Sequence, residues 1–226
     1  MAQSEKLRKL RKDTVINETS KCEEASMMNV VYKIKQELEA EYPSIKFEHK
    51  AQLNLTDVIK EVEKFEPNYT MTEVLETSSI RPDGGFLYAI FPTGEKYLIL
   101  IGEVKNQGTN SKRLIEGLKK QAQGNAIERL GKNVECIKLA VLNQKYNPFV
   151  VFGDGCDFAE GSSIVDRVKT IAHFQPLNTI NTNNNLFGDR GSFFFRDEAW
   201  SEDEYYDIMM TVAKTVLDGC LKDNDE

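Results

Sequence analysis

The chain has 226 residues, 40% of them hydrophobic, and a net charge of −7, which fits one domain with a full hydrophobic core. No apolar run could span a membrane, and no apolar segment follows the basic N-terminus, so neither an anchor nor a secretory signal is expected. Four scattered cysteines and two histidines argue against a zinc site, a disulfide framework and a histidine-centred triad, and indicate free thiols in a reducing cytoplasm.

The charges are unevenly distributed along the chain. Residues 112–145 contain eight lysine or arginine side chains against three glutamates, whereas residues 197–226 contain ten acidic side chains against two lysines. A basic segment is usually a solvated face, but it can also contact phosphate groups. We expect one domain over residues 1–226, with a basic arm or short helix at 1–24 and an acidic tail outside the fold at 222–226.

Helices and strands alternate in groups along the chain. Apolar residues recurring at intervals of three and four predict a helix from Ser26 to Tyr42 and another from Thr56 to the residue before Pro67. Residues 44–54 are strand-like or irregular. Three strands are then expected: near Met71 to Leu75, from Phe86 to Phe91, and from Tyr97 to Lys105.

The second half of the chain returns to a helical period. A helix capped by Ser111 should be interrupted at Gly124-Asn125 and restart toward Leu142. The remaining expected elements are strands at Phe149 to Phe152 and Phe193 to Phe195, a loop-rich stretch at 156–195, and a last helix from Ser201 to Leu221. This order predicts an α/β fold with a mixed central β-sheet flanked by helices.

Three charged residues are expected to meet at one edge of this sheet. Because side chains alternate along a strand, Glu103 and Lys105 point to the same face while Val104 points into the core. Asp83 lies in a Pro-Asp-Gly-Gly turn and can fold back onto the same end. Two carboxylates with a lysine suit a Mg²⁺ site for phosphodiester cleavage. The alternative is an ordinary solvated strand end beside an ordinary turn.

A second motif points to a family. The block Gly124-Asn125-Ala126-Ile127-Glu128-Arg129 follows Pro82-Asp83-Gly84-Gly85 and Glu103-Val104-Lys105, and this order resembles the EcoRI group of type II restriction endonucleases. Shorter matches occur at Glu41-Tyr42-Pro43, Asp166-Arg167 and Pro176-Leu177-Asn178. The resemblance covers roughly residues 28–220 and implies a restriction-endonuclease-like fold.

The resemblance also implies roles for individual residues. Asp83 and Glu103 would be Mg²⁺ ligands, the Val104 carbonyl a third ligand, and Lys105 the catalytic lysine. The recognition block would read a central AATT in double-stranded DNA through Asn125, Ala126, Glu128 and Arg129. Further DNA contacts are expected from Gln121, Arg167, Lys112 and Arg113. Read without the resemblance, Asn125 would be a helix cap and Arg129 a solvated side chain.

A palindrome is read by a two-fold protein, so a homodimer is expected. The resemblance implies 5′ overhangs, GAATTC as the full site, and a companion DNA methyltransferase in the same bacterial cytoplasm. Thr109, Gln121 and Gln123 depart from the family pattern, and in Ile164-Val165-Asp166-Arg167 only Arg167 matches. These positions lie near the outer base pair in the family, so a shorter AATT site and a different outer pair are the alternatives to GAATTC. A repair or structure-selective nuclease would share Asp83, Glu103 and Lys105, and a DNA-binding protein without catalysis is the third alternative.

Overall fold

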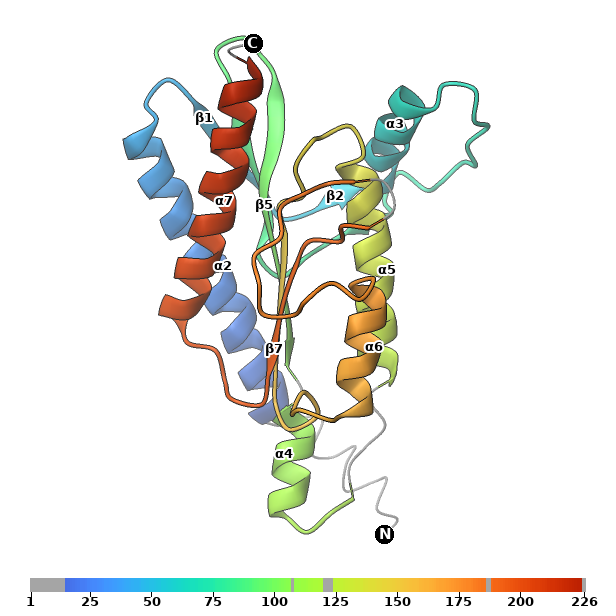
Figure 1. The fold of residues 1–226 in the computed structure, drawn as a ribbon, viewed down its shortest axis with the longest axis vertical. Helices are drawn as coiled ribbons and strands as arrows, with labels where there is room; N and C mark the ends of the chain where they lie inside the picture. The colour runs from blue at the N-terminus through green and yellow to red at the C-terminus, as the bar shows by residue number, and fades with distance from the viewer. Residues whose placement is uncertain (1–14, 107, 120–123, 186–187, 225–226) are drawn as a thin grey trace.

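The computed structural model describes residues 15–106, 108–119, 124–185 and 188–224. A five-stranded sheet lies between two layers of helices, with α2 and α7 on one face and α5 and α6 on the other (Figure 1). The helices are α2 (Val15–Glu41), α3 (Leu55–Phe65), α4 (Gly108–Ile115), α5 (Gly124–Ala140), α6 (Ser163–Ile171) and α7 (Glu202–Asn224).

The sheet is mixed, as predicted. Its strand order is β1 (Lys46–Lys50), β4 (Gly85–Ile90), β5 (Lys96–Asn106), β6 (Phe149–Asp154) and β7 (Ser192–Arg196). The pairs β1–β4 and β4–β5 are antiparallel, whereas β5–β6 and β6–β7 are parallel. Two further short strands, β2 (Leu53–Asn54) and β3 (Ser79–Ile80), pair with each other. Strand β5 therefore lies at the centre, where the antiparallel half meets the parallel half.

Strand β5 is apolar because helices cover it on both faces. Leu98 to Ile101 are almost completely buried, and a strand covered on both faces reads as a continuous apolar run. On one face the core is formed with α2 and α7, which contribute Met27, Val31, Ile34, Leu38, Met209, Val212 and Val216. On the other face it is formed with α5 and α6, which contribute Ile127, Leu130, Val134, Ile137 and Val168.

The two ends of the chain differ from the sequence prediction. Helix α2 begins at Val15 rather than Ser26, because nothing between them breaks a helix, so residues 15–24 are helical, which was one of the two alternatives expected there. Residues 1–14 lie outside the described residues. Helix α7 continues to Asn224, and Asp223 pairs with Lys145 at 2.6 Å, so most of the expected tail is the last turn of this helix.

Three internal predictions were wrong. Residues 71–75 form no strand, and Leu75 is 74% exposed, because the short alternating run has no partner strand there. Ser111 lies inside α4 rather than capping it. Helix α6 occupies part of the expected loop, and Ser162 caps it by accepting a hydrogen bond from the Ile164 N–H at 3.2 Å. No helix among the described residues combines the length and apolarity needed to cross a membrane.

Candidate active site

A tight turn brings Asp83 onto strand β5. The Gly85 N–H donates to the Pro82 carbonyl at 3.0 Å, and the Gly84 N–H donates to the Gly102 carbonyl at 2.9 Å. Gly85 has φ of +67°, and a Cβ there would lie 2.6 Å from the Lys50 carbonyl oxygen, so only glycine fits. The turn directs Asp83 Oδ2 to accept a hydrogen bond from the Val104 N–H at 2.9 Å.

Glu103 and Lys105 project toward helix α5, as strand alternation requires. Val104 packs in the opposite core, with α2 and α7. Glu103 is 1% exposed, and its Oε1 accepts hydrogen bonds from Lys105 Nζ and from Asn133 Nδ2, the latter at 3.0 Å. Its Oε2 is buried and has no hydrogen-bond partner within the described part of the chain. The site therefore contains one carboxylate oxygen that is desolvated and still available.

The electrostatics of the site favour an added cation. Burial raises the pKa of Asp83, and the charge of Lys105 and the Val104 N–H only partly oppose that effect. Burial likewise raises the pKa of Glu103; Lys105 and Asn133 lower it, while the charge of Asp83 raises it further. One lysine thus does not compensate for two neighbouring carboxylates, one buried and one half-buried.

The residues present fit a hard divalent ion. In an extended strand the N–H and C=O of one residue point to the same side, so the Val104 carbonyl faces the edge where Asp83 lies. Across the described ranges no three His, Cys, Asp or Glu side chains gather as a metal site. The available ligands are therefore two carboxylates and one carbonyl. Mg²⁺ accepts such a set because it keeps several waters and takes further oxygens from a phosphate.

Apart from Gln121, the residues expected to bind DNA belong to α4, α5 and α6. Glu128 and Arg129 are exposed in the first turns of α5, and Arg167 is exposed on α6. Figure 1 places α4 and the start of α5 at the end of the sheet where β5 ends. Arg113 donates from Nε to the Lys119 carbonyl at 2.7 Å, and its buried Nη1 has no partner among the residues described.

Some of the predicted contacts cannot be placed. The backbones of Lys112, Asn125 and Ala126 belong to helices α4 and α5, but their side chains lie outside the described part of the chain. Gln121 lies wholly outside the described residues. The structure thus brings together Asp83, Glu103 and Lys105 and leaves these four contacts unplaced.

Sequence reasoning missed two residues that hold the site. Asn133 on α5 bonds Glu103, and its position four residues after Arg129 on the same helical face was the available signal. His49 on β1 bonds the Gly84 carbonyl through Nε2 at 2.9 Å and so supports the turn that carries Asp83. The strand pairing of β1 with β4 put His49 there, and no local sequence pattern indicates it.

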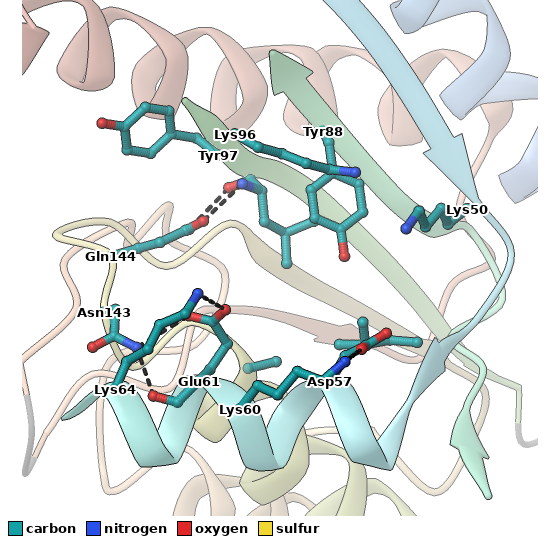
Figure 2. Close-up of a pocket in the computed structure, with 13 residues that line it drawn as sticks. Lys50, Asp57, Lys60, Glu61, Lys64, Tyr88, Lys96, Tyr97, Asn143 and Gln144 are labelled. Carbon is teal, nitrogen blue, oxygen red and sulfur yellow. Dashed lines mark hydrogen bonds and ion pairs between the residues drawn. The ribbon is translucent and has the colours of Figure 1, made fainter. Parts of the chain in front are cut away.

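A hollow at the opposite end of β5 has a different character. It encloses about 550 Å³ between α3 and the strands β4 and β5. Figure 2 shows two of its four lysines paired with neighbouring acids: Lys60 with Asp57 at 2.8 Å and Lys64 with Glu61 at 2.6 Å. The Gln144 amide closes the edge of β5 with two hydrogen bonds to the Leu98 backbone, at 2.7 and 3.1 Å. The other two lysines that line it, Lys50 and Lys96, pair with Glu48 at 3.7 and 2.7 Å, so each lysine of the hollow has an acidic partner and the hollow is not the candidate active site.

Comparisons with known proteins identify the family of this chain. A family model described as restriction endonuclease EcoRI matches residues 11–225. The type II restriction enzyme RsrI of Cereibacter sphaeroides is 27% identical over 228 residues, which cover 85% of this chain and 82% of that protein. The type II restriction enzyme EcoRI of Escherichia coli is 29% identical over 161 residues, which cover 68% of this chain and 58% of that protein. Because the family model extends over nearly the whole chain, this protein belongs to the EcoRI family of type II restriction endonucleases, enzymes that hydrolyse DNA.

Proposed function

We propose that Asp83, Glu103 and Lys105 form a Mg²⁺-dependent site that hydrolyses both strands of DNA at a palindrome centred on AATT. GAATTC is the expected full site, and the cuts leave 5′ overhangs. The observation that carries the proposal is the buried Glu103 Oε2, which has no partner among the described residues and lies beside a half-buried carboxylate and a lysine. Membership of the restriction endonuclease family supports the choice of DNA as substrate.

Each residue of the proposed metal site would have a separate role. Asp83 and Glu103 would hold Mg²⁺, with the Val104 carbonyl facing the same edge. When bound, Mg²⁺ supplies an activated water and offsets negative charge on the phosphate oxygens. Lys105, held against Glu103, would orient the attacking water or place its ammonium group beside the phosphate. Asn133 keeps Glu103 Oε1 occupied, so that Oε2 is the oxygen left for the ion.

The beginning of α5 would read the bases. An asparagine can pair with the N6 and N7 groups of adenine, an arginine can donate to purine acceptors, and an alanine methyl can contact the thymine methyl. Asn125, Arg129 and Ala126 would take these three roles, with Glu128 orienting the side chains. The exposed positions of Glu128 and Arg129 support this assignment.

Contacts to the DNA phosphates and to the outer base pair would come from segments on either side of the recognition block. Arg113 and Lys112 lie on α4, which directly follows the metal site, and Arg167 lies on α6. Gln121 precedes the recognition block. Lysine and arginine contacts to phosphate release counterions, so the affinity for DNA should fall steeply with salt.

A palindromic site implies two chains related by a two-fold axis. We therefore propose a homodimer on DNA, and a companion methyltransferase that modifies the same site without touching this protein. Sedimentation equilibrium with a duplex carrying the palindrome should give two chains per duplex. One chain per duplex would contradict the dimer.

The function is tested by digesting a sequenced plasmid with the purified protein and Mg²⁺, followed by run-off sequencing of the ends. Discrete ends at palindromes centred on AATT, with 5′ overhangs, are expected, and they would also identify the outer pair. A smear, or nicks without a common sequence, would instead indicate a repair or structure-selective nuclease.

A further inference from the structure

We infer that Asn133 is a positioning residue that makes the placement of the Glu103 carboxylate depend on helix α5, and so links base recognition to the metal site. The contact itself is present in the structure: Asn133 Nδ2 donates to Glu103 Oε1 at 3.0 Å. The link to recognition rests on the proposed function, in which the start of α5 reads the DNA.

Asn133 determines which oxygen of Glu103 is free. Oε1 already accepts from Lys105 and Asn133, and Oε2 is buried without a partner in the described ranges. Lysine is a long, flexible donor, so Lys105 alone fixes the carboxylate poorly. The asparagine amide is short and is attached to a packed helix. Without it, the carboxylate could rotate and present either oxygen, or neither, to an ion.

The helix is firmly seated, so its position is defined by packing. Ile127, Leu130, Val134 and Ile137 of α5 are almost fully buried against the sheet. Asn133 lies on the turns between these residues and faces the end of β5. A shift of α5 therefore moves the Asn133 amide relative to Glu103, whereas Lys105 moves with the same strand as Glu103.

Arg129 of the recognition block is a neighbour of Asn133 on the same helix. Arg129 precedes Asn133 by four residues and Asn125 precedes it by eight, and residues four apart are neighbours on a helix. At 1.5 Å per residue they lie about 6 Å and about 12 Å along the axis from Asn133. Bases that contact Arg129 would thus act on α5, the helix whose Asn133 donates to Glu103. A mismatched base pair that displaces the start of α5 would also displace the Glu103 carboxylate.

The experiment compares Asn133→Ala and Asn133→Asp with the wild-type protein. Ca²⁺, a hard ion with the same preference for oxygen ligands, is titrated by calorimetry into the free protein and into the protein with a GAATTC duplex. Partners of metal-binding side chains typically contribute 10- to 100-fold to metal affinity or activity. We expect Asn133→Ala to weaken Ca²⁺ binding and slow single-turnover cleavage by about that factor. We expect Asn133→Asp to slow cleavage as well, because an ionised carboxylate cannot donate a hydrogen bond to Glu103 Oε1, whereas its added negative charge should not by itself weaken Ca²⁺ binding.

Matched measurements separate positioning from general damage. Leu139→Ala, at an exposed position near the far end of α5, is the control and should leave both readouts unchanged. Affinity for the duplex without metal should stay within about twofold in the Asn133 variants. The ratio of cleavage rates between GAATTC and a duplex with one central pair changed should shrink in Asn133→Ala, because the link to recognition is lost.

Two outcomes would overturn the inference. Ca²⁺ affinity like that of the wild type in Asn133→Ala would show that the contact does not position Glu103. Weaker Ca²⁺ binding with an unchanged rate ratio would show that Asn133 has no part in linking recognition to cleavage. Failure of the wild-type protein to cut at any palindrome would refute the proposed function instead, and the Ca²⁺ titration would still decide the Asn133 contact.

Discussion

The two ends of strand β5 contain the same types of side chain in opposite settings. Around its first residues, Lys60 and Lys64 pair with Asp57 and Glu61 at the rim of an open hollow, where water screens the charges. At its other end Glu103 is buried, and two carboxylates share one lysine. Lysines and carboxylates therefore form a solvated surface at one end of β5 and a buried site with an excess of carboxylates at the other.

Burial and an excess of carboxylates, rather than the mere presence of acids and lysines, therefore distinguish the candidate active site. An exposed ion pair contributes about 0 to 1 kcal/mol to the free energy of unfolding, and both of its charged groups remain hydrated. A buried carboxylate oxygen without a hydrogen-bond partner lowers the stability of the protein unless a bound ligand interacts with it. Four predictions test this contrast, from the largest expected effect to the smallest.

Removing a charge at the buried end should abolish cleavage. Asp83→Asn and Glu103→Gln keep the shape of each side chain but remove a ligand charge. Losing several kcal/mol of transition-state stabilisation corresponds to a fall in single-turnover rate of about 10³-fold or more. Specific binding to the duplex should persist in a gel-shift assay. Loss of binding along with cleavage would show that these carboxylates are structural.

Changing Arg129, the arginine proposed to contact the bases, should reduce sequence selectivity more than it reduces activity. Arg129→Lys keeps the charge but loses the planar fork of donors, so discrimination between GAATTC and a duplex with one changed pair should fall by about 1–3 kcal/mol. Competition binding measures this directly. Arg190→Lys is the control, because Arg190 pairs with Glu135 farther along α5, at 3.4 Å. Unchanged discrimination in Arg129→Lys would remove Arg129 from the readout.

An ion pair at the start of α7 should give a moderate, pH-dependent effect. Hydrogen bonds from Arg196, with contributions from Ser201, lower the pKa of Glu204 to about 2. A lowered folded-state pKa stabilises the protein above the unfolded value, 4.5, and this stability is lost as the pH falls toward 2. Because the pair is partly exposed, Glu204→Gln should cost about 0.5–1 kcal/mol at pH 7.

Urea unfolding as a function of pH measures this difference between wild type and Glu204→Gln. The two stability curves should converge as the pH falls from 4.5 to 2. A constant gap across that range would mean that the charge of Glu204 is not responsible.

Removing a lysine at the open end of β5 should have almost no effect. Lys60→Ala breaks the exposed pair with Asp57 and should change the unfolding free energy by no more than about 0.5 kcal/mol, with cleavage unchanged. Thermal unfolding and the plasmid digest are sufficient readouts. A large loss of cleavage would mean that the hollow takes part in the reaction.

Local patterns predicted the parts of the site that depend on one strand and one turn. Strand alternation placed Glu103 and Lys105 on one face, and the Pro-Asp-Gly-Gly turn placed Asp83 near them. The Asp83 bond to the Val104 N–H and the Asn133 bond to Glu103 depend on how distant segments pack. Packing of this kind is not encoded in any short window of sequence.

The same distinction applies to the fold. Long apolar periods predicted α5, α7 and the central strands, because they are buried against the sheet whatever their neighbours do. No strand forms near Met71, because a strand needs a partner and β2 pairs instead with β3. Helix α6 was missed although Ser162 and the apolar residues after it form a capping signal.

The most direct test of the central claim is single-turnover cleavage of two duplexes, one carrying GAATTC and one with a single AATT pair changed, each with Mg²⁺ and with a chelator. The account predicts paired cuts with 5′ overhangs in the first duplex, cleavage of the second slower by at least about 10-fold, and none in chelator. Equal cleavage of both duplexes, or cleavage in the presence of chelator, would contradict it.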